Sequence, residues 1–259
     1  MGVWLGPRGL PKYKRPPLFT FTDNNGNPLN YEYRERVASD GTVNWEAVFK
    51  ITGNLLFTRI VPEIEVFMVG PGENGISGSA SGSTAVGGRG GNGGEVKNAR
   101  VAVNAGIVYP LRVEAPGGVT SGFGVTAAGG AGKPGGAGAR AADNNRTNAG
   151  NGTPGTLSFN GTATDGSDGR LYWYAVRFGA SGGGGGARSP NYTIAAAGYE
   201  ASSNSGDGGL YNAAGKPADL VGSGAGGGGG GSDLGGGQQW NYSAGGAGAS
   251  GIIIIRNAR

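Results

Sequence analysis

Residues 222–231 read GSGAGGGGGG, and residues 182–186 are a second unbroken run of glycines. The region from residue 70 to residue 259 contains 54 of the chain's 60 glycines. Apolar sequence borders this region on both sides, with EVFMV at 65–69 and IIII at 252–255. Two interpretations of the glycine runs are open: a disordered linker, or segments that pack against each other because nothing larger would fit.

The composition alone is typical of low complexity, because Gly and Pro make up 73 of 259 residues without a strict triplet period. The sequence between the runs favours packing. It contains apolar, β-branched and aromatic stretches that a solvated linker does not need, and these are Ile107–Val113, Phe123–Val125, Leu171–Phe178 and Tyr192–Ala196. We therefore expect the glycine-rich region to be folded around these anchors.

Glycine loses more backbone freedom on ordering than any other residue, so an ordered glycine-rich region needs many compensating contacts. Without a Cβ atom, extended threefold helices of the polyproline-II type can lie side by side and exchange backbone hydrogen bonds, each worth about 0.5–1.5 kcal/mol net. At about 3.1 Å per residue, five glycines span about 15 Å. The expected rods are residues 87–94, 129–138, 182–186, 222–231 and 245–251.

Residues 18–69 have a different pattern, that of short antiparallel strands. LFTFT (18–22), LNYEYRERVA (29–38) and VNWEAVFKI (43–51) are separated by turn-forming sequence, and LLFTRIV follows Gly53-Asn54. Alternation of Val43, Trp45 and Ala47 predicts one apolar face and places Trp45 in a core. No stretch is a convincing amphipathic helix. The sequence predicts an all-β chain: a small antiparallel meander over 18–69, then a domain of packed polyglycine-II helices over 70–259 on a short β base.

The composition excludes several kinds of chemistry. The chain has no cysteine and no histidine, which rules out thiol chemistry, a Ser-His-Asp triad and a His-based zinc site. GRGGNG (88–93) matches a dinucleotide-binding pattern, but no helix follows it, and no P-loop exists. The turn aspartates Asp165, Asp168 and Asp207 lack the spacing of a calcium loop. We expect no enzyme activity, no cofactor and no metal, although a hydrolase is not formally excluded.

The net charge of +4 originates in residues 1–17, because Arg8, Lys12, Lys14 and Arg15 have no acid among them and the other 17 basic residues match 17 acidic ones. That distribution does not indicate nucleic-acid binding. No apolar run is long enough for membrane insertion. The Pro- and Gly-rich arm 1–17 is either a peptide that docks on a partner or a frayed terminus.

Aromatic residues in the polar loops between the glycine runs are the candidate binding residues. Tyr and Trp among Ser, Asn and Gly are typical of rigid binding loops, because their rings offer a large contact area at little entropic cost. The alternative is that some of them cap the ends of the glycine rods. The candidates are Tyr192, Tyr199, Tyr211, Trp240 and Tyr242, in loops spanning roughly 139–178, 188–221 and 232–244.

Six stretches of the chain form a recognisable set: MGVWLG (1–6), VNWEAVFKITGNLLFT (43–58), EVFMVGPGENG (65–75), IVYPLRVEAPGG (107–118), SGFGVTAAGG (121–130) and GGAGASGIIIIRNAR (245–259). Together they resemble the glycine-rich tail-fibre and tail-tip proteins of tailed bacteriophages. The likeness covers nearly the whole chain, and its strand and end motifs are more specific than its glycine runs. A more distant similarity is to the fibre-tip adhesins of T-even-like phages.

The resemblance implies a virion protein at the host-facing end of the tail that binds a bacterial cell-surface receptor, glycan or protein, through loops between polyglycine-II helices. Attachment to other tail or baseplate proteins would use the N-terminal arm, and a homotrimer is compatible with a fibre. The alternatives are a purely structural fibre spacer and a surface-glycan depolymerase. LYWYAVRF (171–178) departs from the family's usual glycine and serine, and it is either a core strand or an exposed patch.

Overall fold

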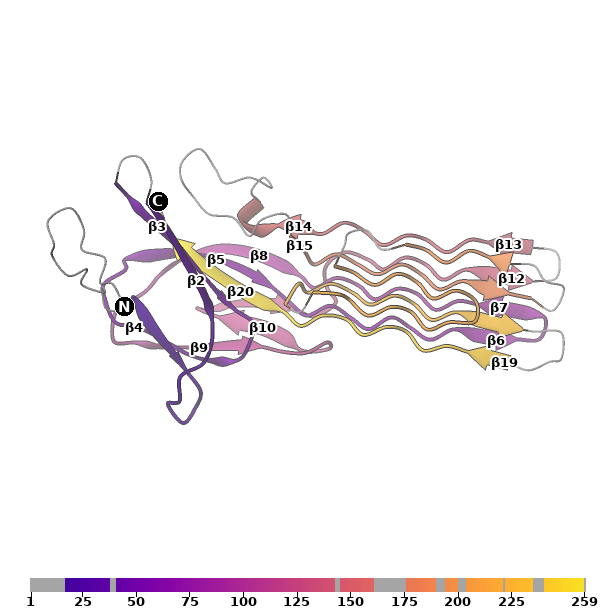
Figure 1. The fold of residues 1–259 in the computed structure, drawn as a ribbon, viewed down its shortest axis with the longest axis horizontal. Helices are drawn as coiled ribbons and strands as arrows, with labels where there is room; N and C mark the ends of the chain where they lie inside the picture. The colour runs from indigo at the N-terminus through magenta and orange to yellow at the C-terminus, as the bar shows by residue number, and fades with distance from the viewer. Residues whose placement is uncertain are drawn as a thin grey trace, which may run out of the picture.

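The computed structural model confirms that the chain is all-β, with several antiparallel sheets and a single 3₁₀ turn at Ser158–Asn160 within its described part. No helix among these residues is long and apolar enough to cross a membrane. The structure describes residues 17–37, 41–142, 145–160, 176–189, 194–199, 204–220, 222–234 and 240–258. Two regions follow one another along the long axis of the molecule, a β-sandwich and a glycine-rich bundle (Figure 1).

The sandwich consists of two five-stranded sheets. The first has the order β1 (Phe19–Thr22), β4 (Gly53–Phe57), β9 (Val108–Val113), β10 (Val119–Gly122) and β11 (Val125–Ala128). The second has the order β2 (Glu32–Val37), β3 (Val43–Phe49), β20 (Ile252–Asn257), β5 (Glu63–Val69) and β8 (Val96–Ala102). Every pairing within these two sheets is antiparallel.

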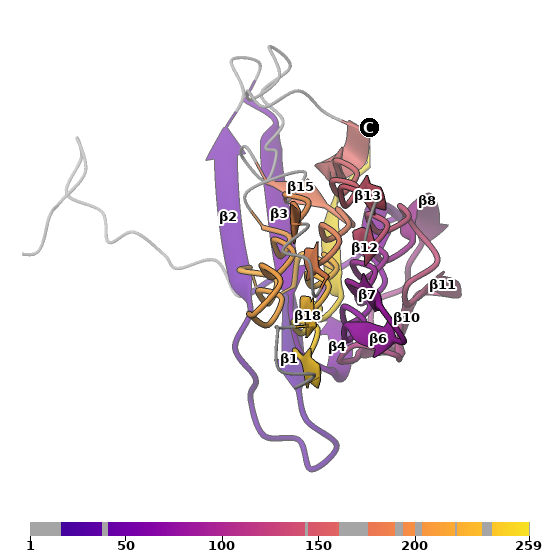
Figure 2. The ribbon, with the colours of Figure 1, turned by 90° about the vertical axis from the view of Figure 1, so that its right-hand side faces the viewer.

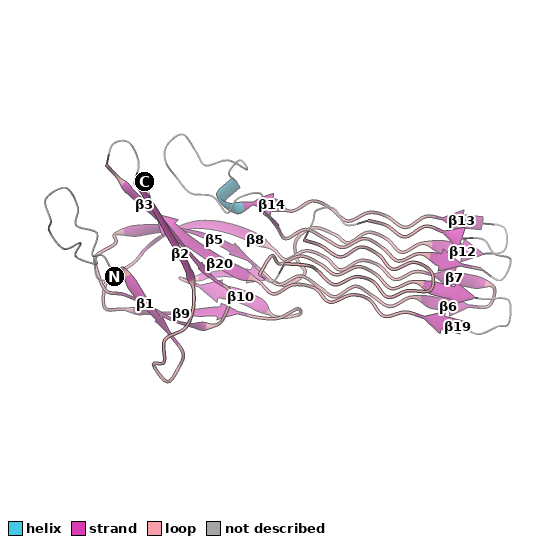
Figure 3. Cartoon of the chain, viewed as in Figure 1, coloured by secondary structure: helices cyan, strands magenta, loops and turns pink. Residues whose placement is uncertain are grey.

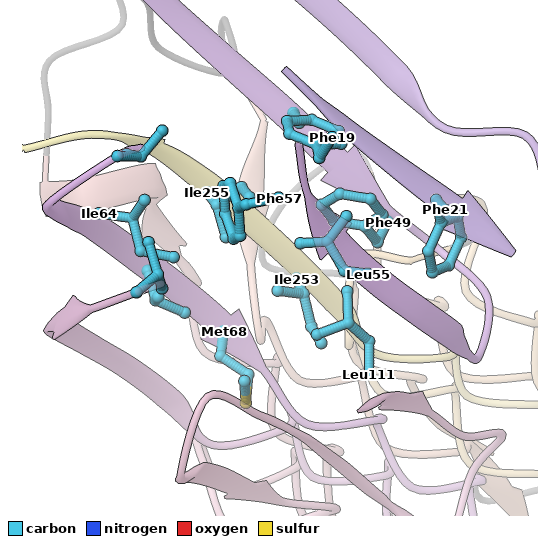
Figure 4. Close-up of a cluster of buried hydrophobic side chains, with 14 of the residues drawn as sticks. Phe19, Phe21, Phe49, Leu55, Phe57, Ile64, Met68, Leu111, Ile253 and Ile255 are labelled. Carbon is cyan, nitrogen blue, oxygen red and sulfur yellow. The ribbon is translucent and has the colours of Figure 1, made fainter. Parts of the chain in front are cut away.

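Large side chains fill the space between the two sheets (Figure 4). Phe19, Phe49 and Phe57 are fully buried there, and their rings meet edge-on or tilted at 5.8–6.0 Å between centroids. Trp45 belongs to the same cluster at 8 % exposure, as predicted. Such aromatic pairs add to the free energy that burial of their area contributes.

The IIII stretch forms β20, the central strand of the second sheet, and both of its faces are buried. Ile253 and Ile255 point into the sandwich core, whereas Ile252 and Ile254 pack on the outer face with Phe67 and Phe178. A strand covered on both faces is apolar at every position rather than at every second one. Phe178, at the end of LYWYAVRF, is therefore a core residue, while residues 171–175 lie outside the described part.

A row of alternating charges crosses the outer face of the second sheet beyond Ile254. The strand registers place one charged residue on each of the five strands directly beside the next. Hydrogen bonds join Arg34 to Glu46 at 2.9 Å, Arg256 to Glu65 at 2.6 Å and Arg100 to Glu65 at 3.0 Å. Opposite charges on neighbouring strands stabilise this pairing, and a slip in register would separate them.

The meander expected over 18–69 differs from the observed topology. Those strands divide between the two sheets, β1 and β4 in one and β2, β3 and β5 in the other, and strands from 96–128 and 252–257 complete both sheets. Sequence-local patterning shows that strands exist but not which distant strand pairs with them. The sequence predicted no strand at β8 (VKNARVA) or β10 (VTSG), which are partly exposed and have polar residues between their apolar ones.

Beyond the sandwich, glycine-rich segments run back and forth beside one another until short strands end the bundle (Figures 1 and 3). Backbone hydrogen bonds join neighbouring segments at intervals of three residues. The amides of Gly88, Gly91 and Gly94 donate to the carbonyls of residues 230, 227 and 224 at 2.7–2.8 Å. The described glycine segments are thus held to one another by their main chain.

Two segments, 179–187 and 223–231, form the centre of the bundle, and we call them the core segments. Every residue in them is buried. Among the described residues, each core segment exchanges backbone hydrogen bonds with six other segments. The first bonds to 87–94, 132–139, 149–155, 196–199, 204–210 and 223–232, and the second to 72–78, 87–94, 179–187, 204–210, 213–218 and 243–250.

This position explains why the longest glycine runs are unbroken. Within the glycine runs of these segments, which have neighbours on all sides, an added side chain meets a main chain. A Cβ atom added at Gly228 would lie 1.7 Å from the carbonyl oxygen of Asp207, and one at Gly185 would lie 2.0 Å from that of Gly230. Segments at the rim tolerate other residues: 87–94 reads GGRGGNGG and carries Arg89 and Asn92.

Asparagine side chains at the rim take the place of a missing neighbour. The Oδ1 atoms of Asn74, Asn92, Asn148 and Asn151 accept hydrogen bonds from backbone amides of adjacent segments, at 2.9–3.1 Å. Without the Asn side chains, these amides would lack a hydrogen-bond partner within the bundle, and an unpaired buried amide costs free energy. These Asn side chains therefore complete the backbone hydrogen-bond network at the lateral edge of the bundle.

Candidate functional site

The end of the bundle away from the sandwich, which we call the distal end, is where the chain repeatedly reverses direction (Figure 1). Within or beside the described residues, the reversals lie between β6 and β7, β12 and β13, β16 and β17, residues 210 and 213, and β18 and β19. These strands are β6 (Ser79–Ser81), β7 (Thr84–Val86), β12 (Arg140–Ala142), β13 (Asn145–Thr147), β16 (Ala187–Arg188), β17 (Ile194–Ala195), β18 (Ser232–Leu234) and β19 (Trp240–Tyr242).

The distal strands form two four-stranded sheets, in the orders β13-β12-β7-β6 and β17-β16-β18-β19. Viewed from this end, β13, β12, β7 and β6 form one row (Figure 2). A layer of small side chains separates the two sheets: Ala85, Ala139, Ala141, Ala187 and Ala195, closed by Leu234. Because alanine keeps the sheets close, the turns beyond them are held on a fixed base.

A bidentate ion pair lies on the outer face of the second distal sheet. Arg188 and Asp233 are direct neighbours on the parallel strands β16 and β18. The Nε and Nη2 atoms of Arg188 donate to the two carboxylate oxygens of Asp233 at 2.7 and 2.8 Å, and the Asp233 side chain is only 7 % exposed. Such paired, partly buried charges fix geometry more than they add stability.

Tyr211 completes this arrangement from the turn at 210–213. The Arg188 guanidinium lies 4.6 Å from the centroid of the Tyr211 ring. Backbone bonds anchor the turn itself, from the amide of Gly231 to the carbonyl of Ala213 and from that of Gly186 to Gly209. The ring is thus held in place by a cation that is itself held by Asp233, a preorganised platform for stacking.

Tyr242 lies on the opposite face of the same sheet. It is paired with Ser232, the neighbour of Asp233, and successive residues of a strand point to opposite faces. Its side chain is 52 % exposed. The structure therefore places two of the predicted tyrosines at the distal end, but on two faces rather than in one continuous patch.

No described side chain of the other three candidates lies at the distal end. Tyr199 is 71 % exposed on the flank of the bundle, where its backbone bonds to Asn151 and Gly152 away from the turns. Trp240 begins β19 opposite Leu234, and its side chain lies outside the described part. Tyr192 lies outside the described residues altogether.

Two further arginines occur at the distal end. Arg146 on β13 is exposed, and its Nη1 donates to the carbonyl of Ile194 at 3.4 Å, across the gap between the two sheets. Arg140 on β12 is exposed beside Val86 and Thr147. Asp233 is the single carboxylate among the described residues of these strands and turns.

The sequence does contain a signal for the ion pair, in the residues that directly follow the two long glycine runs. Each of the two longest runs is followed by one small residue and then a charged one: Gly186-Ala187-Arg188 and Gly231-Ser232-Asp233. Two parallel runs that end at the same level bring these opposite charges side by side. The pairing of the runs themselves has no local signal in the sequence.

The distal end offers an ordered aromatic ring for stacking, and guanidinium groups and turn backbone for hydrogen bonding. Within the described residues, no group of three or more acidic side chains could hold a metal ion. A hollow of about 410 Å³ lies at the other end of the molecule, lined by Tyr31, Trp45 and their neighbours where Pro17 enters the sandwich. No protein-family model and no curated protein sequence matches the chain.

Proposed function

We propose that the protein is a non-enzymatic adhesin of a bacteriophage tail tip or tail fibre, which recognises a bacterial surface receptor through its distal turns. The observation that carries this proposal is the clustering of the turns at the end of the bundle, with Tyr211 oriented by the Arg188–Asp233 pair. The resemblance of the strand and end motifs to phage tail-tip proteins supports the same role. The receptor is a surface glycan or protein.

We infer further that the glycine-rich segments are polyglycine-II helices. An extended threefold helix returns to the same side at every third residue. The three-residue interval of the bonds from Gly88, Gly91 and Gly94 fits that geometry, as does the surrounding of each core segment by six others. In this proposal the glycines bind no receptor; they make a rigid support for the turns.

The opposite end of the molecule would attach the adhesin to the virion. Residues 1–17 carry the four basic residues that give the chain its net charge, and Pro17 enters the sandwich at the end away from the bundle. We propose that this arm binds other tail or baseplate proteins, in a homotrimer where the fibre has threefold symmetry. No nucleic acid, membrane insertion or cofactor takes part.

Cell binding separates this proposal from a spacer and from a depolymerase. Fluorescently labelled protein is added to bacteria susceptible to the phage, and its competition with phage adsorption is measured. Binding and competition support the adhesin, whereas no binding at saturating concentration supports the spacer. A glycosidase of the usual kind uses two carboxylates, and the described residues of the distal strands and turns include one, that of Asp233. Release of reducing sugar would nevertheless identify a depolymerase.

The turns are then tested by replacing both Tyr211 and Tyr242 with alanine. Because rings at the centre of an interface dominate binding, we expect cell binding to fall by more than about tenfold with an unchanged melting temperature. Ile60→Ala is the matched control, since Ile60 is 88 % exposed in the connection between β4 and β5 at the sandwich end. Loss of binding in the Ile60 variant instead would place recognition at the wrong end for this proposal.

A further inference from the structure

Four Asn-Gly pairs lie within the described chain: Asn25-Gly26, Asn74-Gly75, Asn92-Gly93 and Asn151-Gly152. This dipeptide can rearrange without an enzyme. The glycine nitrogen attacks the Asn side-chain carbonyl carbon, a C–N bond forms and ammonia leaves, which gives a cyclic imide. Water then opens the imide to aspartate or to isoaspartate. The attack needs a free glycine amide, an uncommitted Asn side chain and a backbone that can rotate.

The three pairs in the bundle fail all of these requirements. The attacking nitrogens of Gly75, Gly93 and Gly152 are donors to carbonyls of other segments, at 2.8, 2.8 and 3.0 Å. The Asn side chains are engaged as well, since their Oδ1 atoms accept the amides of residues 248, 135 and 199. Rotation into the reactive geometry would break both bonds and move a segment that is packed on its neighbours.

Asn25-Gly26 is the least constrained of the four pairs. It lies in the exposed turn between β1 and β2, and no hydrogen bond of the Asn25 side chain to the described residues is found. The Gly26 amide makes one bond, a turn contact of 3.2 Å to the carbonyl of Asp23. Gly26 has a φ of +84° with open space where a Cβ atom would lie, so the turn has room to change. The carboxylate of Asp23 binds the amides of Asn25 and Asn27 and leaves the reacting atoms free.

We propose that Asn25 is a site of spontaneous deamidation and isoaspartate formation, and that the glycine bundle protects Asn74, Asn92 and Asn151 from the same reaction. Each event at Asn25 replaces a neutral amide with a carboxylate and lowers the net charge by one. Isoaspartate also adds a methylene to the main chain of the turn. Among these four pairs, the one in the sandwich therefore reacts first.

Peptide mapping of aged protein tests the proposal. The full chain is incubated for weeks at 37 °C and pH 8 and digested with trypsin, and the mass increase of one dalton is followed by mass spectrometry. Asn25, Asn74 and Asn92 fall on separate tryptic peptides, and Asn151 falls on a fourth, which also contains Asn148 and the pair Asn160-Gly161, so that fragment ions are needed to assign its modified position. We expect deamidation at Asn25 to be more than about tenfold faster than at the bundle sites, because those sites react only after local opening.

Incubation in urea and one variant provide the controls. In urea, where the bundle is unfolded, all four sites should react at similar rates. The variant Asn25→Gln should lack the fast reaction of the folded protein. Equal rates at the four sites in the folded state would overturn the proposal. So would an Asn25 that survives, in the folded protein, for as long as the bundle asparagines do.

Discussion

Phe49 in the sandwich and Gly228 in the bundle are both fully buried, yet they hold their regions together in opposite ways. Phe49 is surrounded by side chains, including the rings of Phe19, Phe21 and Tyr31 at 4.9–6.0 Å. Gly228 is surrounded by main chain, with the carbonyl of Asp207 where its Cβ would be. A region packed by side chains is weakened when atoms are removed, and one packed by main chain is disrupted when atoms are added.

The largest expected effect is that of Gly228→Val. The new side chain would have to displace the segment at 207–208, whose backbone is bonded on several sides, so we expect a loss of more than about 4 kcal/mol or failure to fold. Thermal unfolding followed by circular dichroism measures it. Ala247→Val, an enlargement at an exposed rim position, is the matched control and should melt within a few degrees of the parent. An unchanged melting curve for Gly228→Val would return the glycines to the linker interpretation.

Phe49→Ala tests the other side of the comparison. Removal of a fully buried ring leaves a cavity among Phe19, Phe21 and Tyr31, and the expected cost is about 3–5 kcal/mol. Urea unfolding with tryptophan fluorescence reports on the sandwich through Trp45. Ile51→Ala, at a 43 % exposed position just after β3, should cost far less. Equal costs for the two variants would mean that the sandwich, like the bundle, is held mainly by its backbone.

The smallest expected effect concerns Glu95, at the junction of the two regions. The hydrogen bond from Lys97, followed by one from the backbone amide of Ala128, holds the pKa of Glu95 below its ordinary value. A lowered pKa means that the ionised carboxylate stabilises the fold at neutral pH and that this contribution is lost as the pH falls through the folded-state pKa.

Glu95→Gln should therefore be less stable than the parent at pH 7 by under about 1 kcal/mol, because the side chain is partly exposed. The difference should shrink as the pH is lowered below about 4. Melting temperatures of both proteins across this range measure it. A difference that stays constant down to pH 3 would show that the charge of Glu95 plays no part in the junction.

The sequence predicted the strands of the sandwich well where they are apolar. The entering strand EVFMV and the closing strand IIII were predicted, and they pair with each other, Val69 opposite Ile252. The continuous apolar character of 252–255 follows from burial on both faces of β20. The pairing of β1 with β4 could not be predicted because it passes over β2 and β3, and that of β4 with β9 because it depends on where the chain returns from the bundle to the sandwich.

The candidate site was predicted less completely. Tyr211 and Tyr242 are at the distal end, but Tyr199 is on the flank, because the segment that carries it extends several residues back from β17 toward the sandwich. Aromatic composition identifies a loop without saying at which level of the bundle it lies. The Arg188–Asp233 pair was missed because its partners are far apart in sequence and meet only when two core segments run in parallel.

The connections between the two regions have a mechanical consequence. The chain passes from β5 into the bundle at Gly70 and returns into β20 at Gly251, and these strands are neighbours in a sheet that runs broadly along the bundle. Hydrogen bonds between antiparallel strands lie across the strand direction. Because β5, β8 and β20 all continue into the bundle at the same end, a pull on the distal end loads β20 against β3 in shear, so that this whole ladder must yield at once. In the proposed adhesin, with one end attached to the tail and the other to a receptor, the sandwich would bear the same force as the receptor contact.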